Sequence, residues 1–133
     1  MLRPLLCTLA LCTLLPVAQA ASLKDLQLTQ ALERIAQQSS AGTPRAINED
    51  ILDQGFTVDG HTLVNHLSVR PAHAANMRGN PDMVRAQLGA SVCRNPGFRQ
   101  VLAQGAQLRY QFSEYRTNRP ITTEVFDRRD CGL

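Results

Sequence analysis

The chain has 133 residues, of which 44% are hydrophobic and 19% are charged, and its formal net charge is +3. This length predicts one domain with one hydrophobic core. The basic residues are scattered singly along the chain, which argues against a nucleic-acid-binding or membrane-surface protein. No run approaches the roughly 20 apolar residues of a membrane span, so we expect a soluble mature chain.

The N-terminal segment is typical of a secretory signal peptide. Arg3 precedes an apolar run over residues 5–15, and Ala18 and Ala20 form an A-x-A cleavage pattern. We therefore predict a signal peptide at residues 1–20. The protein is expected to cross the inner membrane and to reside in the periplasm or outside the cell.

The exported part is predicted to be a single α+β domain at residues 21–133. Cleavage removes Cys7 and Cys12 and leaves Cys93 and Cys131. Disulfides persist in oxidising compartments, so we expect these two cysteines to pair and to close a loop of about 38 residues, worth about 4 kcal/mol of stability. The alternative is a nucleophilic Cys93 assisted by a histidine, which leaves Cys131 without a function.

The domain begins with a predicted amphipathic helix. Ser22 is a candidate N-cap, and Leu28, Leu32 and Ile35 follow at helical spacing. The helix is expected to end near Gly42. A turn-rich connector follows it.

Residues 51–69 are predicted to form a β-hairpin, because Asp59-Gly60 separates two alternating runs and is a preferred two-residue turn. This turn gives three apolar or mixed pairs, namely Val58 with His61, Phe56 with Leu63, and Leu52 with Leu67. It also places Gln54 opposite Asn65. Either the buried layer has a polar gap at this point, or a bulge at Gly55 shifts the pairing.

The next segment, residues 70–80, is expected to be a polar crossover. Asn80 and Pro81 then start a second helix with an apolar stripe of Val84, Leu88 and Val92. Asn95 and Pro96 repeat the same start signal. The helix is therefore either broken there or resumes as a shorter segment.

A second hairpin is expected at the C-terminus. Residues 106–112 alternate, with Leu108, Tyr110 and Phe112 on one side, and residues 121–127 follow a polar turn. The predicted fold class is α+β, a two-layer sandwich of order αββαββ. It has a four-stranded, mainly antiparallel sheet made of two hairpins, with helices on one face.

A family resemblance rests on three stretches, "DGHTLVNHLSV", "VCRNPGFRQVLAQGAQLRYQF" and "VFDRRDC". The chain resembles the small exported bacterial proteins called putative quorum-sensing-regulated virulence factors. In that family a hairpin strand, a helix ending in Cys-x-Asn-Pro, a Gly-led strand and a terminal Asp-x-Cys recur. The resemblance implies export, a two-layer α/β fold and an association with virulence, and it brings no catalytic residue.

Candidate catalytic and metal-binding residues are more simply explained as surface or packing residues. The spacing of His61, His66 and His73 matches no metal-binding signature, and the hairpin places His61 and His66 on opposite faces. We therefore predict no metal site and no cofactor. The carboxylates Glu49, Asp50 and Asp53 are expected to be solvated.

Ser91 and His66 could form a nucleophile and base. Ser91 lacks a nucleophile-elbow context, and its place on the helix predicts packing instead. We therefore predict that the protein is not an enzyme but a binding protein with a protein partner in the envelope or outside the cell. A small-ligand carrier or envelope inhibitor, marked by a polar cleft around Gln54, Asn65 or His66, is the alternative, and a hydrolase is third.

Partner binding is expected to involve outward-facing charges on the second hairpin. Arg109 is predicted to point outward because its neighbours Leu108 and Tyr110 face the core. Glu124 is predicted to point outward because Thr123 and Val125 would take the inner face.

Overall fold

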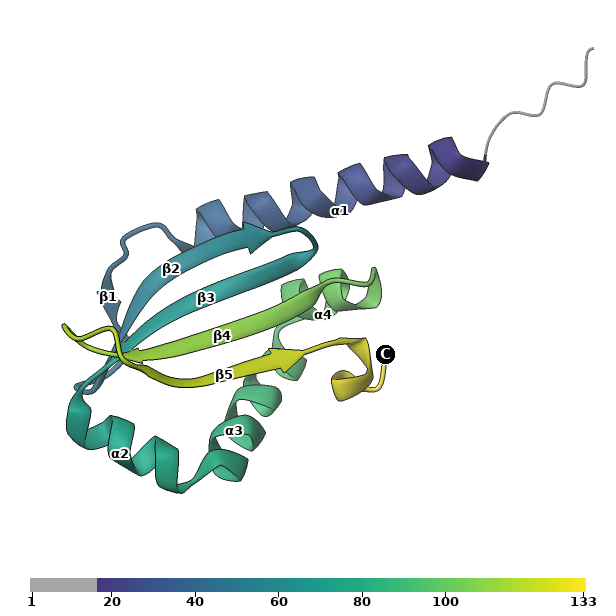
Figure 1. The fold of residues 1–133 in the computed structure, drawn as a ribbon. Coiled ribbons are helices and arrows are strands. Elements are labelled where there is room, and N and C mark those ends of the chain that lie inside the picture. Colours follow the sequence, from purple (N-terminus) through teal and green to yellow (C-terminus); the bar gives the residue numbers. More distant parts are fainter. Residues whose placement is uncertain (1–16) are drawn as a thin grey trace, which may run out of the picture.

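The computed structural model describes residues 17–133. Its elements in chain order are α1 (Val17–Ser39), β1 (Arg45–Ala46), β2 (Ile51–Asp59), β3 (Thr62–Val69), α2 (Pro71–Gly79), α3 (Pro81–Arg94), α4 (Pro96–Ala103), β4 (Gln107–Glu114), β5 (Pro120–Phe126) and the 3-10 helix η1 (Arg128–Cys131). Figure 1 shows them as one sheet with helices packed behind and beside it.

The predicted signal peptide lies outside the described residues except for its end, residues 17–20, which belongs to α1. Ser22 is therefore inside the helix of this uncleaved chain and not at its N-cap. The prediction treated the helix as starting at a new N-terminus. The alanine-rich sequence before Ser22 favours helix and extends α1 backwards.

The sheet has five strands in the order β1-β2-β3-β4-β5. Three neighbouring pairs are antiparallel, whereas β3 and β4 are parallel. Both predicted hairpins form, as β2-β3 and β4-β5, but the prediction of a four-stranded sheet of order αββαββ is wrong in two details. The two-residue β1 lies in the connector, and the long crossover through α2, α3 and α4 returns the chain to the end at which β3 began.

The helical crossover also differs from prediction. Residues 70–80, expected to be a polar crossover, contain α2, which starts at Pro71 and buries only Ala74 and Met77. Two buried positions are too few to give a visible apolar stripe. The next helix is broken as expected at Asn95, whose side chain accepts a hydrogen bond from Phe98 N and so caps α4.

The first hairpin forms, but with a different register. Asp59 pairs with Thr62, so the two-residue turn is Gly60-His61, with Gly60 at a positive φ of 58°. The predicted pairing of Val58 with His61 is therefore wrong, as are the pairings that follow from it. A register shift between residues 53 and 55 shows that the bulge, rather than a simple polar gap, is present.

All four α-helices pack on one face of the sheet. Buried side chains of α1, α2, α3 and α4 belong to the same hydrophobic cluster as Leu63, Leu67, Leu108, Phe112 and Phe126 of the strands. Figure 1 looks onto the opposite face, with α3 and α4 behind the strands. Within residues 17–133 the sheet thus has one helix-covered face and one uncovered face.

Candidate functional site

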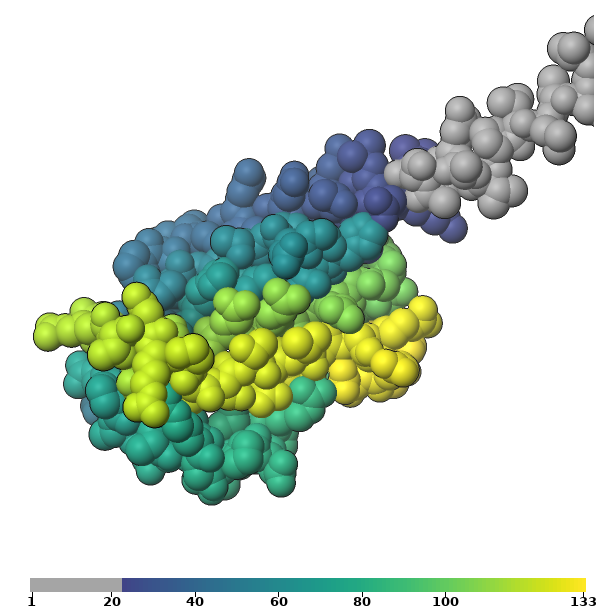
Figure 2. Space-filling model, in the orientation of Figure 1, coloured from purple at the N-terminus to yellow at the C-terminus, as the bar shows by residue number. Residues whose placement is uncertain are grey.

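The uncovered face is built by every second residue of the strands. In β4 the predicted alternation is present, since Leu108, Tyr110 and Phe112 are buried toward the helices. Gln111 and Ser113 therefore face the other way. Figure 2 shows the strand surface on this side with no helix lying across it.

Polar residues occupy two adjacent rows of this face. In one row His66 of β3 pairs with Gln111 of β4, which pairs with Thr123 of β5. In the next row Ser68 lies beside Ser113. Imidazole, carboxamide and hydroxyl groups thus replace the apolar side chains that fill the other face.

These rows line a half-open cleft of about 570 Å³. Its polar lining residues are Gln54, His66, Ser68, Gln111, Ser113, Asn118 and Thr123, with Pro120 beside them. The sequence analysis named a polar cleft around Gln54, Asn65 or His66 as the mark of the alternative, a small-ligand carrier, and Gln54 and His66 do line this one. Asn65 is not part of it, because its side chain is buried on the helix-covered face.

Two β-bulges account for the hollow shape of the face. One lies in β2 between Asp53 and Gly55, and the other lies between β4 and β5 next to Phe112. Leu67 pairs with both Asp53 and Phe112, so the two bulges fall on the same row across the sheet. Bulges bend strands and increase their twist, and here they crease the sheet where the cleft lies.

Hydrogen bonds hold the lining side chains in place. Gln54, the extra residue of the first bulge, donates through Nε2 to Ser68 Oγ at 3.2 Å. His66 Nε2 lies 2.7 Å from Thr57 Oγ1. The bulge therefore turns a carboxamide into the cleft, a function that bulges often serve near binding sites.

The two predicted partner-binding residues face opposite ways. Arg109 lies on the uncovered face between Val64 and Val125, and its guanidinium is 3.5 Å from Asp59. Glu124 lies on the helix-covered face, so its predicted outward orientation is wrong. The β-branched Thr123 and Val125 were assigned to the core, but they face solvent.

Glu124 is held on the inner side by an arginine. Arg85 of α3 donates to Glu124 Oε2 at 3.1 Å and to the carbonyl oxygen of Val125, also at 3.1 Å. Arg78 of α2 contacts Glu114 in the same way and donates to the carbonyl oxygen of Pro120 at 2.9 Å. The hydrogen bond from Arg78 is the main cause that holds the pKa of Glu114 below its usual range.

These contacts also protect the outer edge of the sheet. Arg78 and Arg85 donate hydrogen bonds to backbone carbonyl oxygens of β5. At the other edge, strand β1 has only two residues. Exposed edges are the usual places where an added strand pairs. A partner is therefore more readily accommodated on a face of this sheet than along its edges.

A buried polar cluster on the helix-covered face escaped prediction. Asp53, expected to be solvated, is only 4% exposed, and its Oδ1 accepts from Gly55 N and from Asn65 Nδ2, both at 2.9 Å. Tyr110 is nearby, and burial first, then the charge of Asp53, raises the pKa of Tyr110 to about 12. The residue spacing gave no signal for this cluster, because it depends on the bulge.

The described histidines do not converge. His61 lies 2.6 Å from Asp25, and His73 lies 3.7 Å from Asp50. His66 is on the uncovered face, whereas Ser91 is exposed on α3 in the helix layer, so these two are on opposite sides of the sheet. The expected packing of Ser91 is therefore also wrong. Among residues 17–133, no three His, Cys, Asp or Glu side chains lie close enough to hold a metal.

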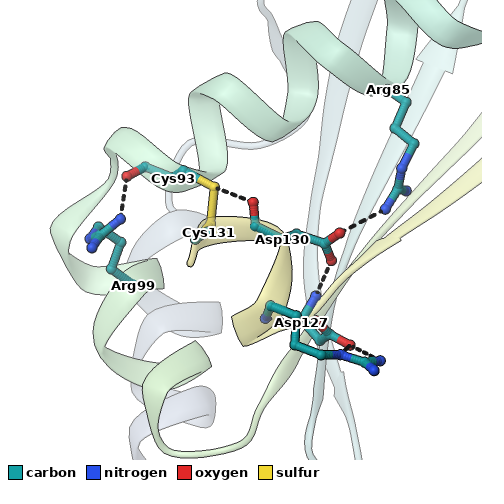
Figure 3. The surroundings of a disulfide bond; sticks show 7 residues. Arg85, Cys93, Arg99, Asp127, Asp130 and Cys131 are labelled. Carbon is teal, nitrogen blue, oxygen red and sulfur yellow. Dashed lines mark hydrogen bonds and ion pairs between the residues drawn. A yellow bond between two sulfur atoms is a disulfide. The ribbon is translucent and has the colours of Figure 1, made fainter. Parts of the chain in front are cut away.

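A disulfide joins Cys93, near the end of α3, to Cys131 of η1, as the sequence predicted (Figure 3). Around it Arg99 donates to the carbonyl oxygen of Cys93 at 3.2 Å, and Arg85 donates to Asp130 Oδ1, also at 3.2 Å. The bond connects the helix layer to the segment that follows β5. It lies away from the residues that line the cleft.

Comparison with known proteins identifies the family. The family model described as "Putative quorum-sensing-regulated virulence factor" matches residues 21–132. The chain belongs to this family. Comparison with curated proteins gives no match.

Solved structures share the fold of this family member. The crystal structure of a "putative secreted protein (PA3611)" from Pseudomonas aeruginosa is similar, with 63% sequence identity, a TM-score of 0.79, and coverage of 82% of this chain and 96% of that one. A pilotin of the Vibrio vulnificus type 2 secretion system, EpsS, has 17% identity, a TM-score of 0.68 and coverage of 84% and 98%. The Vibrio cholerae pilotin AspS has 19% identity, the same TM-score and coverage of 84% and 99%.

The two pilotins are similar to this chain in fold alone. Within the described residues, no helix combines the length and apolar character needed to cross a membrane.

Proposed function

We propose that this family member is an exported, non-enzymatic binding protein that holds a protein partner on the uncovered face of its sheet. The observation that carries the proposal is the cleft of about 570 Å³ on that face. Its wall is made of hydrogen-bonding groups, most of which stay at least partly exposed.

The arrangement of titratable groups favours binding over catalysis. A small hydrolase needs a nucleophile or an acid and base within hydrogen-bond reach of each other. Among the cleft residues His66 is the single titratable side chain, and its Nε2 is beside a threonine hydroxyl. Hydrogen bonding to a ligand is the chemistry that such a lining supports.

The similar proteins support an exported location. One is described as a putative secreted protein, and two others are pilotins of type 2 secretion systems. A signal peptide at residues 1–20 would deliver the chain to the periplasm or the medium. The disulfide would be stable in either compartment.

A small-ligand carrier is the second candidate, favoured by the volume of the cleft, which lies in the range of small-molecule sites. Such sites are usually concave enough to bury most of the ligand. This cleft is half open along a sheet face. It therefore suits a segment of a larger partner better than a small molecule that must be enclosed.

Partner capture with charge variants tests the proposal. The exported, oxidised protein is immobilised and exposed to envelope and secreted fractions, in parallel with Arg109→Glu and Glu124→Gln. We expect Arg109→Glu to weaken retention of the partner several-fold, and Glu124→Gln to retain it, since Glu124 faces the helices.

Circular dichroism first establishes that each variant is folded. Retention that is lost in folded Glu124→Gln and kept in Arg109→Glu would contradict the proposal. So would a partner that is chemically altered during turnover by the immobilised protein.

A further inference from the structure

The cleft at the crease of the sheet indicates what kind of ligand the uncovered face binds. We propose that the cleft binds a short, extended, uncharged peptide segment of the partner through its main-chain amides, with an acidic residue at the end next to the β4–β5 turn. The inference rests on the proposed function. It adds the chemical class of the ligand to the face that was proposed to bind it.

The lining matches peptide groups. Gln111 presents a carboxamide with two N–H donors and a carbonyl acceptor, and Gln54 presents a second carboxamide, of which Nε2 already donates to Ser68 Oγ. These are the same kinds of group that a peptide bond offers in return. Ser68, Ser113 and Thr123 add hydroxyls that donate or accept. Because no Asp, Glu, Lys or Arg lines the cleft, a charged side chain in its centre would lose hydration without gaining a counter-charge.

The size of the crease sets the length of the segment. It runs from the bulge in β2 to the bulge at β5, across three strand spacings, or about 14 Å. An extended chain advances about 3.3 Å per residue, so about four residues fit. The protected edges of the sheet direct such a segment to the face instead of pairing it as an added strand.

The charge at one end of the cleft gives the peptide a direction. Asn118 lines the cleft, and the exposed Arg116 and Arg119 flank it in the β4–β5 turn. Among the described residues neither arginine forms a salt bridge within 4 Å, although the charge of Arg119 also reaches Glu114, so an acidic side chain of the partner would complement them. In Figure 2 this turn stands out at the left edge of the surface.

The lining also distinguishes a peptide from a glycan. Sugar-binding sites commonly stack an aromatic ring against the apolar side of a pyranose. The aromatic residue at the cleft, Phe112, has its side chain in the core on the other face. The lining therefore favours peptide amides.

The experiment selects ligands from a random octapeptide library displayed on phage, with the oxidised exported protein as target. We expect the enriched sequences to share about four uncharged residues next to an Asp or Glu. A synthetic enriched peptide should shift the NMR signals of Gln54, Gln111 and Thr123 side chains or amides.

Matched variants test the contacts. Gln111→Leu should weaken binding of that peptide about tenfold, the loss of a paired buried amide contact. Gln107→Leu, the same change on the same strand and face but outside the cleft, should stay within twofold. Thr123→Val is a second cleft variant in case Gln111→Leu fails to fold, and it should weaken binding several-fold.

The role of the two arginines is tested with a second peptide, in which Asn or Gln replaces the acidic Asp or Glu. The double variant R116S and R119S should bind the acidic peptide several-fold more weakly and the amide peptide unchanged. Equal effects on both peptides would overturn the assigned direction.

Two further outcomes separate this inference from the proposed function. A soluble glycan panel that yields a ligand in the cleft, with no peptide enriched, would overturn the peptide and leave the binding face standing. Enriched peptides that shift Met77 and Leu88 on the helix side, and not Gln111, would overturn both.

Discussion

Polar side chains lie on both faces of the sheet, but their surroundings differ. On the helix-covered face Asp53, Asn65 and Glu114 are buried, and each is hydrogen-bonded within the protein. On the uncovered face the amides and hydroxyls keep hydrogen-bonding capacity that faces the cleft. Polar residues on the inner face are thus enclosed by protein, whereas those on the outer face border an open cleft even where they hydrogen-bond to each other.

The largest effect is expected from a change that destabilises the helix layer without altering a residue of the cleft. Cys131→Ser opens the link between α3 and η1, so we expect a loss of about 4 kcal/mol of stability and a melting temperature lower by about 15 °C. Thermal circular dichroism without reductant measures the shift, and thiol labelling confirms that wild type has no free thiol. An unchanged melting temperature would show that the helix layer needs no such link.

A smaller effect is expected from matched truncations on the two faces. Asp53→Ala leaves Gly55 N without its carboxylate acceptor in a buried position and should cost about 2–3 kcal/mol. Thr123→Ala on the uncovered face should cost less than about 0.5 kcal/mol. Urea unfolding of both variants provides the numbers, and equal losses would remove the distinction between the faces.

The smallest effect is a titration. Burial raises the pKa of Tyr110 to about 12 from 10.0, so between these pH values the unfolded chain ionises this phenol and the folded one does not. Stability should therefore fall as the pH rises above 10. Tyrosinate absorbance of the folded protein should show a late step that Tyr110→Phe removes, and the absence of that late step would contradict burial of this ring.

The features that were predicted correctly from the sequence depend on local residue patterns or on the compartment. Alternation in β4 correctly placed Leu108, Tyr110 and Phe112, the chain break at Asn95 was anticipated, and the pairing of Cys93 with Cys131 followed from export. These features depend on neighbouring residues or on the compartment. They did not require knowledge of the tertiary structure.

The errors have a common physical origin in tertiary contacts. Glu124 was assigned outward because Thr123 and Val125 were expected to take the inner face, yet Arg85, far away in the sequence, compensates the charge of Glu124 on that face. The bulge at Gln54 placed Asp53 in the interior and a carboxamide in the cleft, and the sequence left that bulge as one of two alternatives. A residue's face in a sheet cannot be read from its polarity where a distant partner or a bulge intervenes.

The most direct test of the uncovered face as the binding surface is photo-crosslinking in intact cells. A photoreactive amino acid is placed at Thr123, exposed in the cleft, or at Ala86, exposed on α3 in the helix layer. The account predicts a crosslinked partner from position 123 and none from position 86. A partner crosslinked from position 86 and absent from position 123 would contradict it.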